Sequence, residues 1–377
     1  MKKMQLIFGK TVMISIVLML MALSVMIVPA FAKTESKSEA KVIAEGDLGS
    51  GIHWQISDDQ ALTISGKGEM PDSGSGNISE YIETNSFPWG TYVQDIRSVV
   101  VEDGIENVAD GAFNGLNQVE SADIGNSVKT LGKCAFSNCY ALSSVKLPDG
   151  LTDIGASAFY RCHKLSDVNL PSSLTDIGRA AFYQCGMKSL IIPQSVTTLA
   201  DWTFSDCYQL KNVVFSEGAE MGQGVFFDCT KLESVVFHEG VESIPDYAFR
   251  VKPGYTIGDG SGDSLKIFIP KSVTTISSSA FLGRSPVLFG YSGSAAETFA
   301  STGSAEGTYT FQAIKDESEL KKAGFAVPSQ ATLYLYSHPA PASTGENSSL
   351  DDVIVRGLRA VLKPEADKDT FGSGGEV

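Results

Sequence analysis

The amino-acid sequence predicts a repeat solenoid, and three observations support this prediction. A phenylalanine recurs eight times at nearly constant spacing between residues 113 and 281. Short alternating apolar runs recur with the same period, and proline follows several of them. A unit this small cannot bury its own phenylalanine, so neighbouring units must stack to form a core. We therefore expect one continuous core that runs the length of the array.

The repeat period is set by the phenylalanines, most of which follow an alanine. They are Phe113, Phe136, Phe159, Phe182, Phe204, Phe226, Phe249 and Phe281. The successive intervals are 23, 23, 23, 22, 22, 23 and 32 residues, and the long last interval contains an insertion around Gly254 to Asp263. Leucine-rich repeats have periods of roughly 20 to 29 residues. The period therefore favours this class of solenoid.

Each unit begins with a predicted strand. In the run from Leu142 to Leu147, the side chains of Val145 and Leu147 point to one face, and those of Ser144 and Lys146 point to the other. Proline ends the strand where its missing N–H costs no ladder bond. The prolines at this position are Pro148, Pro171, Pro193 and Pro270. An apolar pair follows, with a turn glycine in some copies (Gly132, Gly155, Gly178). The Ala-Phe pair then starts a return segment that we expect to be short and helical or irregular.

The first 32 residues have the organisation of an export signal. Lys2, Lys3 and Lys10 lead into an apolar run from Val12 to Val28, which ends in Ala30-Phe31-Ala32. A single membrane-spanning anchor is the alternative interpretation of the run. Removal of residues 1–32 changes the net charge from −15 to −18. This charge argues against nucleic acid and anionic lipid as partners.

The rest of the chain divides into three predicted parts. Residues 33–95 form a β-rich N-terminal capping segment, with strands at Ile52–Ile56 and Ala61–Ser65. Residues 96–314 form the repeat array with its closing unit. Residues 315–377 form a C-terminal tail of unknown role, in which a short helix from Asp316 to Lys322 ends at Gly324. Further along the tail we expect a strand at 331–336, a linker at 337–349 and an amphipathic helix at 351–362.

The repeat resembles a known family. The string L-x-x-[VL]-x-[LI]-P-x-x-[LV]-x-x-I-[GS]-x-x-A-F-x-x-C is similar to the BspA-type leucine-rich repeat of bacterial surface proteins. The segments at 54–70 and 87–89 resemble the family's entry segment, and Gly290–Ala300 resembles its closing unit, so that the resemblance covers about residues 46 to 314. The sequence departs from the pattern in three places: Leu116 stands where later units have cysteine, the seventh unit carries the insertion, and the residues after Ala313 lie outside the resemblance. The resemblance implies a curved, right-handed array in a secreted or cell-surface protein of adhesion and recognition, with no shared catalytic site.

Five of the six cysteines occupy one repeat position, three residues after the phenylalanine; Cys134 alone lies elsewhere. The five are Cys139, Cys162, Cys185, Cys207 and Cys229. Equal positions in a solenoid stack about 5 Å apart, which a disulfide tolerates. An odd-numbered column cannot pair completely, however, and buried thiols that donate weakly to neighbouring turns are the favoured interpretation. The spacing does not match a zinc site.

No grouping typical of catalysis is found in the sequence. The four histidines (His53, His163, His238 and His338) are interpreted as surface or loop residues, and no G-x-S-x-G is present. Asp259, Ser261 and Asp263 alternate like calcium ligands but lack the glutamate and glycine of an EF-hand, which favours a plain loop. We therefore predict no catalytic residue, no metal, no cofactor and no enzymatic activity; a site in the tail is the less favoured alternative.

The candidate binding surface is the strand face turned away from the core. Its central row is Val100, Asp123, Lys146, Asn169, Ile191, Val214, Val236 and Phe268. An exposed apolar strip is typical of a docking site, so the candidate ligand-binding residues are Ile191, Val214, Val236 and Phe268. The alternatives are ordinary β-propensity and a loop or tail that covers the row.

The predicted function is recognition or adhesion through the sheet face, with a protein or glycan on a host or neighbouring cell as partner. A structural spacer or self-associating scaffold is the alternative.

Overall fold

The computed structural model describes residues 40–72, 86–166, 168–215, 219–258, 260, 263–302, 309–316 and 318–325. The chain divides into two units, residues 1–41 and 42–377, and the description below concerns the second. The expected export signal lies outside the described residues, as do the tail elements expected after Phe325. Within the described ranges, no helix combines the length and the hydropathy needed to span a membrane.

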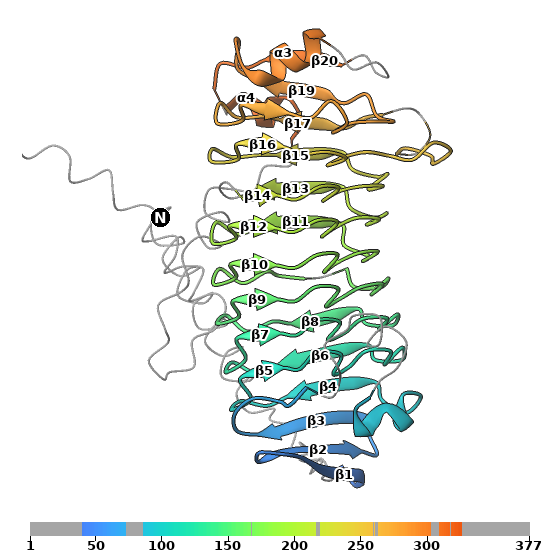
Figure 1. Ribbon diagram of the computed structural model, residues 1–377. Coiled ribbons are helices and arrows are strands. Elements are labelled where there is room, and N and C mark those ends of the chain that lie inside the picture. Colours follow the sequence, from blue (N-terminus) through green and yellow to red (C-terminus); the bar gives the residue numbers. More distant parts are fainter. Residues whose placement is uncertain are drawn as a thin grey trace, which may run out of the picture. The chain divides into compact units, whose positions relative to one another are not determined.

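The first side of each turn is a strand, as predicted, and these strands pair in parallel from turn to turn in two sheets, one ending at β8 and the next starting at β11 (Figure 1). In chain order these strands are β4 (Ser98–Val101), β6 (Ser121–Ile124), β8 (Ser144–Lys146), β11 (Ser189–Ile192), β13 (Asn212–Phe215), β15 (Ser234–Val236), β17 (Lys266–Phe268), β19 (Val287–Gly290) and β20 (Thr310–Ala313). The turn between β8 and β11 contributes no assigned strand at Val168–Leu170. About nine such turns make the protein a leucine-rich repeat β-solenoid.

The second side of each turn is a strand of only two residues. These strands are β5 (Asn107–Val108), β7 (Thr130–Leu131), β9 (Asp153–Ile154), β10 (Asp176–Ile177), β12 (Thr198–Leu199), β14 (Glu220–Met221), β16 (Ser243–Ile244) and β18 (Thr275–Ile276). Glycine follows four of these strands, at positions where adjacent turns approach closely: Gly132, Gly155, Gly178 and Gly222. A Cβ on Gly155 would lie 2.7 Å from the carbonyl carbon of Gly132.

The third side is the Ala-Phe return, which is irregular and contains no helix in the described turns. Two left-handed residues flank the phenylalanine, as at Cys134 (φ 55°) and Asn138 (φ 58°) around Phe136. This alternation directs backbone N–H groups to the next turn: Phe136 N donates to Ala158 O at 2.7 Å. Left-handed non-glycine residues cost on the order of 1 kcal/mol each. The ladder of inter-turn hydrogen bonds offsets this cost.

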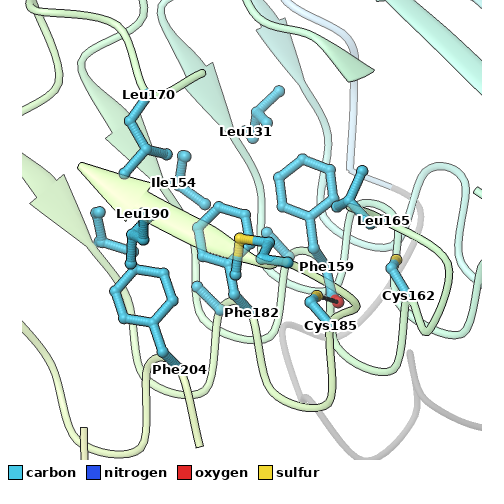
Figure 2. Packing of buried hydrophobic residues seen from close by; sticks show 14 of the residues in the cluster. Leu131, Ile154, Phe159, Cys162, Leu165, Leu170, Phe182, Cys185, Leu190 and Phe204 are labelled. Atoms are coloured by element: carbon cyan, nitrogen blue, oxygen red, sulfur yellow. Dashed lines mark hydrogen bonds between the residues drawn. The ribbon is translucent and has the colours of Figure 1, made fainter. Parts of the chain in front are cut away.

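The phenylalanines form a single stack through the core, and Figure 2 shows Phe159, Phe182 and Phe204 of this stack. All eight are fully buried, and successive ring centroids lie 4.9 to 5.7 Å apart. Trp89 continues the stack beyond Phe113 at one end, and Phe299 and Tyr309 contact Phe281 at the other. The predicted continuous core is confirmed.

The cysteines form a column of free, buried thiols, as the favoured interpretation predicted. Each column thiol donates to the carbonyl of the phenylalanine in the preceding turn at 3.1 to 3.2 Å, as Cys185 Sγ does to Phe159 O in Figure 2. Cys134 stands outside the column because it occupies a left-handed position of the return. Burial raises the pKa of the Cys134 thiol to about 11, and it raises the pKa of the Cys139 thiol further.

Both ends of the array are closed. Strands β1 (Val42–Gly49), β2 (Ile52–Ser57) and β3 (Ala61–Gly66) form an antiparallel cap, and β3 pairs in parallel with β4. The 3-10 helix η1 (Pro88–Tyr92) places Trp89 against the first phenylalanine. At the other end, helix α3 (Ala295–Thr302) packs beside β19 and β20.

Candidate functional site: the outward face of the strand sheet

The outward row predicted from the sequence is a physical column in the sheet. Strand pairing places Val100, Asp123 and Lys146 side by side, and it also aligns Ile191 with Val214. From Val214 the column continues across the sheet: Val214 pairs with Val236, Val236 with Phe268, and Phe268 with Phe289. We call this column the outward row.

The apolar half of the outward row is not exposed. Val214 is 3% exposed, and Val236 and Phe268 are fully buried; Ile191 is half-buried. The expectation of an exposed apolar strip is therefore corrected at Val214, Val236 and Phe268. They form a second hydrophobic cluster on the side of the sheet opposite the phenylalanine stack. Of the alternatives considered, coverage by the tail is the one observed.

The cover is the chain's own C-terminal strap, which we define as the described residues from Ile314 to Phe325. Ile314, Leu320 and Phe325 are buried in the same cluster as the row. The Phe325 ring meets Phe289 edge to face, with centroids 5.0 Å apart. Lys266 Nζ donates to Ala323 O at 2.7 Å, which fixes the strap to β17 by a polar contact as well.

The strap adopts its shape for local reasons. Helix α4 (Ser318–Lys322) ends in a left-handed glycine, Gly324 (φ 81°). Phe325 N donates to Leu320 O, and Gly324 N donates to Lys321 O, both at 3.1 Å. This is the Schellman arrangement, in which the residue after the glycine contacts the helix. The predicted helix and its glycine stop are confirmed, and the stop directs Phe325 onto the row.

The first half of the outward row, apart from Val100, is open and polar. Lys146 Nζ lies 3.0 Å from Asp123 Oδ1, and their side chains are 70% and 55% exposed. Asn169 is exposed, and Val100 is half-buried. A solvated ion pair of this kind contributes little to stability, about 0–1 kcal/mol. These side chains are therefore available to a partner at little cost to the fold.

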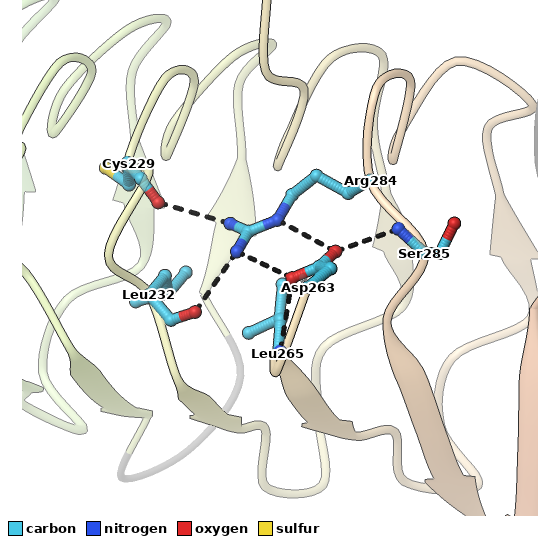
Figure 3. Close-up of polar contacts among 6 residues, drawn as sticks. All are labelled: Cys229, Leu232, Asp263, Leu265, Arg284 and Ser285. Carbon is cyan, nitrogen blue, oxygen red and sulfur yellow. Dashed lines mark hydrogen bonds and ion pairs between the residues drawn. The ribbon is translucent and has the colours of Figure 1, made fainter. Parts of the chain in front are cut away.

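The insertion after Phe249 is joined to the array by a buried ion pair (Figure 3). Arg284 Nη2 lies 3.0 Å from Asp263 Oδ1, and the two side chains are 0% and 6% exposed. Arg284 stands at the cysteine-column position, three residues after Phe281, and its guanidinium donates to the carbonyls of Cys229 and Leu232. Asp263 is thus committed to a structural contact; Asp259 and Ser261 lie outside the described residues.

The remaining candidate groups are metal-ligating clusters and the four histidines. In the ranges that the structure covers, no group of three or more His, Cys, Asp or Glu side chains could hold a metal ion. His53 and His163 are exposed, as expected, and His238 is half-buried. His338 lies outside the described residues.

Comparisons with known proteins agree with the repeat. Residues 80–211 and 135–254 match the BspA type leucine rich repeat region, in six copies. Among solved structures, the chain is similar to a leucine-rich repeat protein from Eubacterium ventriosum (23% identity over 66% of this chain and 73% of that one, TM-score 0.47). A leucine rich repeat protein of T. pallidum is 24% identical over 56% of this chain and 96% of that one, with a TM-score of 0.37. A search of curated proteins gave no match.

Proposed function

We propose that this chain, whose residues 80–254 match the BspA type leucine rich repeat region, is an exported repeat protein of the cell surface that recognises a protein or glycan partner. The N-terminal export pattern and the family resemblance support this localisation. In this proposal the solenoid acts by binding and has no catalytic role.

The recognition surface is the open half of the outward row, centred on Asp123 and Lys146. The observation that carries this assignment is the unequal covering of the row: the strap buries Val214, Val236 and Phe268, whereas Asp123, Lys146 and Asn169 stay exposed. Ile191 stands at the boundary between the two halves. The three covered residues contact a partner only if the strap leaves the row.

The proposal is tested by binding the exported chain (residues 33–377) to host cells and to neighbouring bacterial cells, with Lys146→Glu as the variant. Lys129→Glu is the matched control, because Lys129 is also exposed but precedes the second-side strand β7. We expect Lys146→Glu to reduce cell binding at least tenfold and Lys129→Glu to leave it unchanged. Equal binding by both variants contradicts the assignment to this face.

A structural role through self-association is the second candidate. Strand β1 is an edge strand, and its first residues, Val42 and Ile43, are 39% and 52% exposed. An apolar edge strand is a ready site for pairing with another chain. Light scattering over a concentration series distinguishes the candidates: a rising mass that Ile43→Lys abolishes supports the scaffold.

A further inference from the structure

The third side of the array carries a patch of positive charge. It consists of three consecutive Ala-Phe returns, at residues 132–141, 155–164 and 178–186, which we call the basic patch. These returns contain no Asp or Glu, and their exposed bases are Lys133, Arg161, Lys164 and Arg179. The returns on either side, at 109–118 and 200–209, contain aspartate and neither lysine nor arginine. Positive charge is thus concentrated on three turns of a chain that has 44 acidic and 29 basic residues.

The four bases of the basic patch have no partner in the fold. Across the described residues, none of their side chains takes part in an ion pair or a hydrogen bond. Lys252, further along the third side, differs, because its Nζ lies 2.9 Å from Oδ2 of the buried Asp228. The Arg161 guanidinium lies 5.1 Å from the centre of the Tyr160 ring, a contact that leaves its N–H groups open. Uncompensated like charges attract a counter-charge, so the patch is suited to an anionic partner.

Two stacks of rings lie among these bases. The ring centroids of Tyr160 and Tyr183 are 4.8 Å apart, and those of Tyr140 and His163 are 5.4 Å apart. Each ring is held by the ring of the next turn, so binding costs little side-chain ordering. Apart from these bases and rings, the residues of the patch that are not buried are Gln184 and several alanines and glycines.

This composition fits an acidic polysaccharide better than an acidic protein. Guanidinium and ammonium groups form charge-assisted hydrogen bonds with carboxylates. Tyrosine hydroxyls and the Gln184 amide can both donate to and accept from the hydroxyls of a sugar. Protein partners, by contrast, are held mainly by side chains that fill well-packed pockets. The basic patch exposes no aliphatic side chain larger than alanine on which such packing could form.

Charge density separates the polysaccharide from nucleic acid. Double-stranded DNA carries one negative charge per roughly 1.7 Å of its axis. Only three turns of the array are basic, and the chain as a whole has a net charge of −15, so it repels a dense polyanion that extends beyond the patch. A polysaccharide in which a uronic acid alternates with a neutral sugar has fewer charges to repel and more hydroxyls to bind.

We propose that the basic patch binds an acidic polysaccharide of this alternating kind, with Arg161 and Arg179 binding uronate carboxylates and the two ring stacks contacting the neutral sugars. The patch lies on the third side of the turns, whereas Asp123 and Lys146 lie on the first side. The inference therefore does not depend on recognition through the outward row.

The test measures binding of hyaluronan oligosaccharides to the exported chain (residues 33–377) by isothermal titration calorimetry. NaCl is set to roughly 0.01 M and 1 M, where the Debye length is about 30 Å and 3 Å. We expect binding at low salt that weakens about tenfold or more at high salt, because the carboxylates are bound by solvent-exposed charges. Uncharged dextran should not bind. Polyglutamate and duplex DNA, matched to hyaluronan in number of charges, should bind about tenfold more weakly.

Two double variants decide whether the basic patch is responsible. Arg161→Gln with Arg179→Gln removes two exposed charges from the patch, and Lys67→Gln with Lys129→Gln removes two exposed charges from the cap and the second side. The first should weaken hyaluronan binding about tenfold or more, since hydrogen bonds to charged groups are worth roughly 1.5–3 kcal/mol each. The second should leave binding unchanged, as should Lys146→Glu.

A conservative pair of substitutions separates carboxylate recognition from charge alone. Arg161→Lys with Arg179→Lys keeps the charge of the patch but loses the planar fork that matches a carboxylate, so binding should be weaker than in the parent and stronger than in the glutamine variant. The proposal is overturned if hyaluronan does not bind, if the two glutamine double variants bind it equally, or if polyglutamate or DNA binds as tightly as hyaluronan.

Discussion

The buried ion pair between Asp263 and Arg284 allows a stability prediction whose sign can be worked out from the structure. In Asp263→Ala, the Arg284 guanidinium remains fully buried and bonded to the carbonyls of Cys229 and Leu232, but its counter-charge is gone. Removal of one partner of a buried pair costs about 3–5 kcal/mol, because the remaining charge is left uncompensated. We expect the free energy of unfolding to fall by that amount.

Removal of both charges should cost less than removal of Asp263 alone. Arg284→Met keeps most of the side-chain volume, and in the double variant with Asp263→Ala no buried charge remains. The double variant loses the hydrogen bonds that Arg284 donates to two carbonyls and those that Asp263 accepts from Leu265 N and Ser285 N. Replacement of a buried pair by apolar side chains is often nearly neutral. The double variant is therefore predicted to be more stable than Asp263→Ala.

Urea unfolding followed by circular dichroism measures this order, with Asp123→Ala as the control. Asp123 belongs to the exposed pair with Lys146, so its loss should cost less than about 1 kcal/mol. An Asp263→Ala variant within about 1 kcal/mol of the parent, or a double variant less stable than Asp263→Ala, would refute the reasoning. Either result would mean that water reaches the guanidinium and screens its charge.

Three further predictions concern the core, the thiols and the strap. Phe159→Ala leaves a cavity within the stack and should lower the unfolding free energy by about 3–5 kcal/mol in the same urea assay. Because burial raises the pKa of the Cys134 thiol from 9.0 to about 11, the folded chain holds this proton more tightly than the unfolded chain, and stability should fall by up to about 1.4 kcal/mol per pH unit between pH 9 and 11. At pH 8 the thiol should react with Ellman's reagent only after denaturation, and rapid reaction of the native protein would count against its burial. Leu320→Asp should release the strap and expose Val236 and Phe268, detected as increased binding of a hydrophobic dye and faster amide exchange in β15 and β17; unchanged exchange would show that the strap does not protect the row.

The repeat core could be predicted because its cause is local and recurs. Each phenylalanine must be buried against the next, so its period alone places Phe113 to Phe281 in one stack. The thiol column followed from the same period. The sequence does not predict strand β1, because the alternation of Val42–Gly49 is weak: its first residues are exposed, and Glu45 and Asp47 lie on its outer face. The position of β1 is fixed by its antiparallel pairing with β2, and this pairing cannot be read from the residues of β1 alone.

The outward row could not be interpreted from its own residues, because valine and phenylalanine fit a pleated surface whether it is solvated or covered. The deciding information lies about a hundred residues further along the chain than Val214, in Leu320, Gly324 and Phe325. Their pattern predicted the helix and its end, but not the surface on which the helix docks. The change from polar to apolar at Ile191 is then the edge of the strap's footprint. In the proposed recognition role, a partner would therefore meet the open polar half of the sheet first, because access to Val214, Val236 and Phe268 requires the strap to leave the row.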